Sequence, residues 1–425
     1  MFLALQPNNL SCPDMSFTAP PVTTGLCIKR LSNDGSRGID GKKLKIKIKP
    51  MSYDSLKKIL GYMEGNKRFE LSSRCPSVRT ADQVTPLRIE QFNYYDENKL
   101  IVNDTVYELS IIRHLRNAKN PESITKANEK GGVSYDVDIF GRRIWNYSER
   151  RLPTPGDIGP FKSDRNTHPD VIQRFREDYE ADVATVRCNN YLKLTVSLGT
   201  KEIVNYKRSI GMAMKSLTSK FLGNRKSPIQ VNHLAMEANL IRLPVGLQFR
   251  IRKLSTHQNF NKLMDGLKNI LDERSFPLDY VQTPSGDKGY KGVGHPVVRS
   301  AKILAISDRD KNTNWSDFLP NLHNPEIRLL NDEIEEAVIP VITNWKYFGR
   351  DIGTQFTSLS IRKRFMQEII ERVTRQFPSG VEVSERCIMI PRNKDSAIQV
   401  SFEEDGNEYF MPKIEMVKNE SESSK

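Results

Sequence analysis

Residues 240–254 read LIRLPVGLQFRIRKL, and this stretch indicates the fold more clearly than any other part of the 425-residue chain. From Leu243 to Ile251 an apolar side chain occupies every second position, which is typical of a strand with one buried face. A helical stripe of apolar residues follows over 260–271, and the apolar run at 301–306 predicts a buried strand. This succession favours an α/β arrangement with a partly parallel sheet.

The alternation of helices and strands continues toward the C-terminus. Apolar spacing predicts helices over residues 334–345 and 361–373, the first of them kinked or shortened by Pro340. Closing strands are predicted at residues 387–390, 398–402 and 409–417. The fold class is therefore α/β in the mixed α+β sense, with an open sheet and flanking helices. The spacing of the units is irregular, so a leucine-rich-repeat-like stack is left open as an alternative form of this sheet.

Toward the N-terminus, the patterns predict helices over 171–179 and 210–221 and a strand over 191–198. Apolar runs separated by polar turns predict several strands over 86–112. The long stretch 116–169 is rich in Gly and Pro, and a loop of that length is either functional or a linker between domains.

These patterns divide the chain into five parts, with a domain boundary near residue 165. The predicted parts are a flexible basic N-terminal extension (1–50), a helical motif (51–80), a β-rich segment with a long loop (81–165), an α/β domain (166–418) and a disordered tail (419–425).

The helical motif begins where Ser52 or Asp54 can cap a helix, and Gly65 with Asn66 predicts a break. Its apolar residues are Leu56, Ile59, Leu60, Met63, Phe69 and Leu71. They form a larger apolar surface than so short a segment can bury by itself. The surface must pack either on the rest of the protein or on a partner, and both alternatives stay open.

The segment 42–50, KKLKIKIKP, alternates strictly, so that Leu44, Ile46 and Ile48 share one face of a predicted strand. Lysines on the other face are typical of an edge strand that avoids pairing with other sheets. A nuclear-localisation or nucleic-acid patch is the alternative. We favour the edge strand, because localisation clusters rarely interleave with β-branched residues at a period of two.

The charge balance points only weakly to nucleic acid. Lys and Arg number 65 against 52 Asp and Glu, a formal net charge of +13. Residues 1–50 contain eight basic and three acidic residues, and the remaining excess is spread thinly. The basic and aromatic residues do not interleave as they do in single-strand binders. We do not expect a nucleic-acid partner, nor a membrane, since no apolar run approaches the roughly 20 residues of a spanning helix.

Catalytic and metal-binding motifs are not found in the sequence. The five cysteines and six histidines are scattered, without metal-ligand spacing, and no phosphate loop or nucleophile elbow is present. The glycine-rich run 286–294 lacks the context of a phosphate cradle and is interpreted as a surface loop. We expect a non-catalytic protein without cofactors, whose reduced thiols suit the cytoplasm or nucleus.

Residues 51–80 resemble a shortened F-box. The shared features are the apolar pair Ile59-Leu60, the pair Tyr62-Met63, the polar position Asn66 and the close Cys75-Pro76-Ser77. From residue 51 onward the chain is similar to the nematode-expanded F-box C family. The matching stretches are GGVSYDVDIFG (131–141), TPGDI (154–158), LIRLPVGLQFRIRKL (240–254), LKNILDERSFPLDYV (267–281), HPVVRSAKIL (295–304), GRDIGTQFT (349–357) and RCIMIP (386–391).

This resemblance implies a substrate-recognition adaptor. Such a protein docks on a Skp1-like linker of a cullin–RING ubiquitin ligase and presents a protein substrate through its remaining domain. The six apolar residues of the helical motif would then be anchors of a helix-in-groove contact with the linker. Two alternatives stay open: a protein-interaction scaffold without ligase docking, and a basic nucleic-acid-binding protein.

Overall fold

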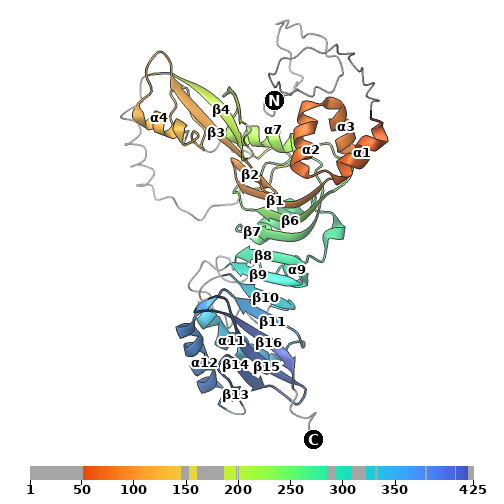
Figure 1. Ribbon diagram of the computed structural model, residues 1–425, viewed down its shortest axis with the longest axis vertical. Helices are drawn as coiled ribbons and strands as arrows, with labels where there is room; N and C mark the ends of the chain where they lie inside the picture. Colours follow the sequence, from red (N-terminus) through yellow and green to blue (C-terminus); the bar gives the residue numbers. More distant parts are fainter. Residues whose placement is uncertain are drawn as a thin grey trace, which may run out of the picture.

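One open sheet forms the framework of the molecule. The computed structural model describes residues 51–144, 153–159, 186–197, 199, 201–284, 292–307, 322–330, 334–378, 381–406 and 408–419. Within these residues, 16 strands belong to a single sheet, which runs from one end of the molecule to the other (Figure 1). Helices lie along the sheet. The mixed α+β class with an open sheet and flanking helices is therefore confirmed.

The strands predicted over 86–112 form an antiparallel group. They are β1 (Arg88–Asp96), β2 (Lys99–Val102) and β3 (Thr105–Leu115), and β3 continues the sheet into β4 (Cys188–Val196) and β5 (Lys201–Asn205). Asn103 adopts a φ of 51° in the turn between β2 and β3, a conformation that Asn tolerates better than most residues. With α4 (Glu122–Glu129), which was not predicted, β3 and β4 form an arm beside the main sheet (Figure 1).

The middle of the sheet is parallel. Its strands are β6 (Ile229–Met236), β7 (Phe249–Thr256), β8 (Tyr280–Pro284), β9 (Ile303–Ser307), β10 (Glu326–Leu329) and β11 (Gln355–Ser358). Each pairs in parallel with the next one along the chain. Residues paired across these neighbouring parallel strands are separated in sequence by 20 positions at the least, as Gln230 and Arg250 are, and by 29 at the most, as Glu326 and Gln355 are. This spacing of about 20–29 residues falls within the range of leucine-rich repeats, although the regular repeat signature is absent from the sequence.

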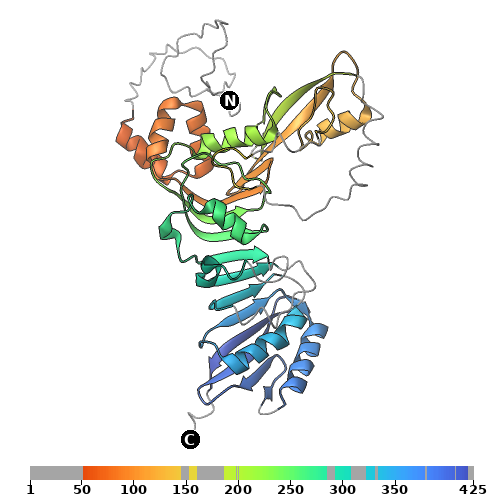
Figure 2. The same ribbon diagram turned by 180° about the vertical axis from the view of Figure 1, so that it is seen from behind.

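The C-terminal strands close the sheet as predicted, and the structure shows that they pair in antiparallel order. They are β13 (Glu382–Val383), β14 (Cys387–Pro391), β15 (Ser396–Glu404) and β16 (Tyr409–Lys418), and β16 pairs with both β11 and the short β12 (Ile361–Arg362). Helices α11 (Ile334–Phe348) and α12 (Lys363–Gln376) lie on one face of these strands (Figure 2). Pro340 lies inside α11 and does not end it.

A continuous row of buried side chains explains why the strands form one body. Strand register aligns Phe92, Leu234, Leu254, Val281, Leu304, Ile327, Phe356, Ile414, Val400 and Ile388 across ten strands. Each of these side chains is at most 1% exposed. The buried faces of α7 (Ile210–Leu222), α8 (Phe260–Leu267), α11 and α12 belong to the same apolar core. The other face of the sheet carries polar residues such as Lys253, Arg328 and Glu415.

The strand predicted over 240–254 is shorter than its pattern suggests. Only Phe249–Thr256 is a strand, because Pro244 cannot donate a ladder hydrogen bond and Gly246 turns the chain with a φ of 73°. Leu240, Ile241 and Leu243 are nevertheless buried. Among the alternating positions Leu247, Phe249 and Ile251 are also buried, but Val245 is 70% exposed, so the alternation predicted burial at all but one position and strand structure only from Phe249.

Several predictions lie outside the described residues. They concern the extension 1–50 with its lysine-rich segment 42–50, the helix 171–179, most of the glycine-rich run, the boundary near residue 165 and the end of the tail. Strands on both sides of that boundary belong to the same sheet, because β1 pairs with β6 and β3 pairs with β4.

Candidate functional site

The helical motif consists of three helices at one end of the sheet (Figure 1). They are α1 (Tyr53–Tyr62), α2 (Gly65–Arg74) and α3 (Pro76–Val84). Ser52 caps α1, since its hydroxyl accepts a hydrogen bond from the Ser55 amide at 3.2 Å. Pro76 stands at the first position of α3, where its missing N–H costs nothing. The predicted break at Gly65 is instead the start of α2.

The structure separates the six predicted anchors. Ile59 and Leu71 are 43% and 39% exposed, and Leu56 and Met63 are half-buried. Leu60 and Phe69 are buried, and the ring of Phe69 stacks on Phe221 of α7 with 4.4 Å between centroids. The expectation that all six face a partner is therefore wrong for Leu60 and Phe69. They pack within the protein because α1–α3 rests on the rest of the fold.

Two exposed aromatic residues of α1 were not among the predicted anchors. Tyr62 is 94% exposed and Tyr53 is 50% exposed. Tyr62 follows Ile59 by three positions, so the two side chains are neighbours on the helix surface. The spacing alone could have revealed this pair. We define the exposed apolar set as Tyr53, Ile59, Tyr62 and Leu71, which the half-buried Leu56 and Met63 adjoin.

A buried ion cluster fixes the helical motif to α7. Nε of Arg68 lies 2.5 Å from Oδ1 of Asp82, and Nη2 of Arg225 lies 2.7 Å from Oδ2 of the same carboxylate. All three side chains are at most 5% exposed. Burial lowers the pKa of Arg225, and the negative charge of Asp82 opposes that shift. The cluster joins α2, α3 and the end of α7.

Asn66 has a structural role that its sequence pattern did not suggest. Its side-chain amide donates to the carbonyl of Val102 at 2.9 Å, and its oxygen accepts from the Tyr107 hydroxyl at 2.9 Å. Burial raises the pKa of Tyr107, so the phenol stays protonated and keeps donating. Asn66 therefore connects α2 to β2 and β3.

The TPGDI stretch carries a second buried carboxylate. Oδ2 of Asp157 lies 2.6 Å from Nη1 of Arg242, and Oδ1 lies 2.8 Å from Nζ of Lys215 on α7. Asp157 also accepts from the Thr154 amide at 2.8 Å. The backbone of Ile158 bridges that of Ile241. These contacts fasten a short segment of the long loop to α7 and to the segment before β7.

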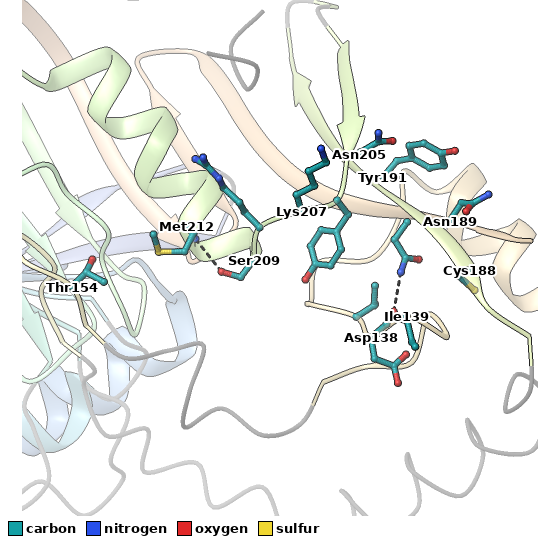
Figure 3. A pocket seen from close by; sticks show the side chains of 14 residues that line it. Asp138, Ile139, Thr154, Cys188, Asn189, Tyr191, Asn205, Lys207, Ser209 and Met212 are labelled. Atoms are coloured by element: carbon teal, nitrogen blue, oxygen red, sulfur yellow. Dashed lines mark hydrogen bonds between the residues drawn. The ribbon is translucent and has the colours of Figure 1, made fainter. Parts of the chain in front are cut away.

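A pocket of about 870 Å³ with a mixed polar and apolar lining lies between β4, the start of α7 and the loop after α4 (Figure 3). Its lining includes Asp138, Tyr191, Lys207, Ser209 and Met212. The amide of Met212 donates to the Ser209 hydroxyl at 3.3 Å, so this N-terminal group of α7 is already satisfied. The pocket thus has a mixed lining and lies beside a capped helix.

The chemistry available in this pocket is limited. Burial raises the pKa of the Cys188 thiol, with a smaller opposing effect of Arg113, which disfavours the thiolate. Across the part of the chain that the structure describes, no three His, Cys, Asp or Glu side chains are grouped to hold a metal ion. The pocket offers hydrogen-bonding groups rather than an activated nucleophile.

Comparison with known proteins identifies one region. Residues 209–362 match the sequence model of a family described as domain of unknown function DUF3557. The match begins at the cap of α7 and ends in β12, so it contains the whole parallel run from β6 to β11. No curated protein matches the chain. No solved structure matches it either. None of the helices in the described ranges is long and apolar enough to cross a membrane.

Proposed function

We propose that the chain is a substrate-recognition adaptor of the F-box type. In this role α1–α3 docks on a Skp1-like linker of a cullin–RING ubiquitin ligase, and the remaining fold presents a protein substrate. The resemblance of residues 51–80 to an F-box suggests the class of partner. The observation that carries the proposal is the exposed apolar set on α1 and α2.

The exposed apolar set has the character of a binding surface. Tyr62 and Ile59 leave 94% and 43% of their surface in solvent, although α1 already buries Leu60 against the protein. Apolar side chains at helical spacing, left uncovered on a folded module, suit a helix-in-groove contact. Aromatic and aliphatic residues of this kind supply most of the binding free energy in such contacts.

The two alternatives for the helical motif, packing on the protein itself or on a partner, thus concern different residues. Leu60 and Phe69 pack internally, and the exposed apolar set is what a linker would contact. This division changes the design of the test. A charge at Leu60 would destabilise the protein itself, since that side chain is 0% exposed, and loss of binding would then have no clear meaning.

The test is co-precipitation of the full chain with a purified Skp1-like linker. We expect the wild-type chain to bind, and Ile59→Asp and Tyr62→Asp to weaken binding roughly tenfold or more, as removal of a central anchor does. Ile203→Asp is the matched control, because Ile203 is 59% exposed on β5, away from α1. All three variants should keep the melting temperature of the wild type. No binding by the wild-type chain would rule out the adaptor and favour a scaffold without ligase docking.

A further inference from the structure

Two arginines and a histidine gather at the N-terminal ends of β9, β10 and β11. Arg299 lies in α9 (Pro296–Ser300) just before β9, His323 just before β10, and Arg350 just before β11. Nη1 of Arg350 lies 3.2 Å from Nδ1 of His323. Burial lowers the pKa of His323, and the charges of Arg350 and Arg299 lower it further. The three side chains are therefore neighbours.

A third arginine, Arg392, joins this group from the turn between β14 and β15. The guanidinium of Arg392 packs against Gly349, and its Nε is buried without a hydrogen-bond partner. The Gly353 amide donates to the Met416 carbonyl at 2.7 Å, which holds the turn before β11 against the end of β16. A buried guanidinium N–H without a partner is costly unless an anion or water meets it.

Two aromatic side chains stand exposed beside these cations. Tyr347 and Phe348 end α11 and are 75% and 77% exposed, whereas Trp345 on the same helix is 1% exposed. Gly349, with a φ of 75°, turns the chain directly after them. Exposed aromatic residues beside arginines are typical of protein interfaces. We define the basic–aromatic edge as Arg299, His323, Tyr347, Phe348, Arg350 and Arg392.

We infer that the basic–aromatic edge binds an acidic segment of another protein. Carboxylates of that segment pair with Arg299 and Arg392, and an apolar side chain packs on Tyr347 and Phe348. Guanidinium groups bind carboxylates through paired hydrogen bonds, so the charges are complementary. The edge runs across the ends of five neighbouring strands, β9, β10, β11, β16 and β15. At the usual strand spacing its length is about 19 Å. An extended segment of about six residues covers that length.

A polypeptide suits this edge better than a nucleic acid. Asp351 is exposed on the turn that carries Arg350; burial lowers the pKa of that arginine, and the negative charge of Asp351 opposes this shift. A phosphate chain carries a charge at every nucleotide and would approach Asp351, whereas a peptide can place an uncharged residue there. The edge also lies along the middle strands of the sheet, apart from α1–α3 (Figure 1), so this inference does not depend on linker docking.

The first test selects from a random library of 12-residue peptides displayed on phage, with the full chain as bait. The double variant Tyr347→Ala/Phe348→Ala serves as the comparison bait. We expect the wild-type chain to enrich peptides that combine at least two Asp or Glu with Leu, Ile, Phe or Tyr. The double variant should lose this enrichment. Enrichment of basic peptides, equal enrichment by both baits, or no enrichment at all would overturn the inference.

The second test measures binding of the most enriched peptide by fluorescence anisotropy. Arg299→Glu should weaken binding at least tenfold, and raising salt from 50 to 200 mM should weaken it severalfold. Ile203→Ala is the control, because it removes an exposed apolar side chain on β5, far from β9–β11 in the strand order, and should change neither value. A fluorescent 12-nucleotide single-stranded RNA is measured in parallel. If the RNA binds more tightly than the peptide and Arg299→Glu abolishes its binding, the edge is a nucleic-acid site and the inference is wrong.

Discussion

Single buried charges determine how the helical motif is held. Asp82 is the one carboxylate in contact with Arg68 and Arg225 in their ion cluster, and the two arginines would repel one another without it. Nothing in the local sequence marks these residues as buried, since charged side chains are mostly exposed. Arg68 lies 14 positions from Asp82, but Arg225 lies 143 positions from it, so the complete cluster depends on a contact between distant parts of the chain.

We predict that Asp82→Ala lowers the free energy of unfolding by about 3–5 kcal/mol, because it leaves two buried guanidinium groups without their counter-ion. Urea denaturation followed by circular dichroism measures the loss. Asp54→Ala is the matched control. Asp54 also pairs with a cation, with 2.9 Å between its Oδ1 and Nζ of Lys57, but its side chain is 82% exposed. That change should cost less than about 1 kcal/mol. Equal losses in both variants would contradict a special role for the buried cluster.

At the scale of elements, the TPGDI segment shows how a loop becomes part of the core. Gly156 has a φ of 91°, and a Cβ there would lie 2.7 Å from the Leu243 carbonyl oxygen. Glycine is therefore required twice, by the backbone conformation and by the close approach of the next segment. The sequence shows the glycine but not the carbonyl that faces it.

We predict that Gly156→Ala destabilises the protein by about 2–4 kcal/mol, of which roughly 1 kcal/mol comes from the left-handed conformation and the rest from crowding. Gly246→Ala separates the two contributions. Gly246 has a φ of 73°, but a Cβ there meets nothing within 4 Å. Gly246→Ala should therefore lower the free energy of unfolding by only about 1 kcal/mol. Thermal and urea unfolding of both variants give the comparison. Equal losses in the free energy of unfolding would show that the surrounding structure shifts and relieves the crowding at Gly156.

At the scale of elements, the sequence predicted long periodic segments well and short ones poorly. The strands over 86–112, the helices α1, α7 and α8 and the closing strands β14–β16 lie where their patterns place them. The strands β6, β8, β10 and β11 were not predicted. Two of them have only four residues and one has five, too few for periodicity to distinguish a strand from a buried turn.

The whole molecule depends on one sheet that no single segment can form alone. β6 pairs with β1 on one side, and β11 pairs with β16 at the other end of the parallel run. The region that matches DUF3557 therefore has a partner strand from outside it at each edge. The helical motif adds Phe69, which stacks on Phe221 inside that region.

We predict that an isolated fragment 209–362 does not fold as a soluble monomer. Its strands β6 and β11 would present unpaired edges, and exposed strand edges promote aggregation. Size-exclusion chromatography and thermal circular dichroism of the fragment and of residues 51–419 provide the test. The longer piece should be monomeric with a cooperative transition, and the fragment should aggregate or lack one. A monomeric fragment that unfolds cooperatively would show that the matched region is an independent domain.

The sequence by itself determined the class of fold, the long amphipathic elements and the apolar character of α1, because these depend on periodicity within a few residues. Only the tertiary structure decided that the parallel strands stack in chain order, that Leu60 and Phe69 are buried while Tyr62 is exposed, and that Asp82 and Asp157 are buried among cations. It also brought Arg299, Arg350 and Arg392 to one edge beside Tyr347 and Phe348. These features depend on strand pairing and on contacts between distant residues, which local patterns do not encode.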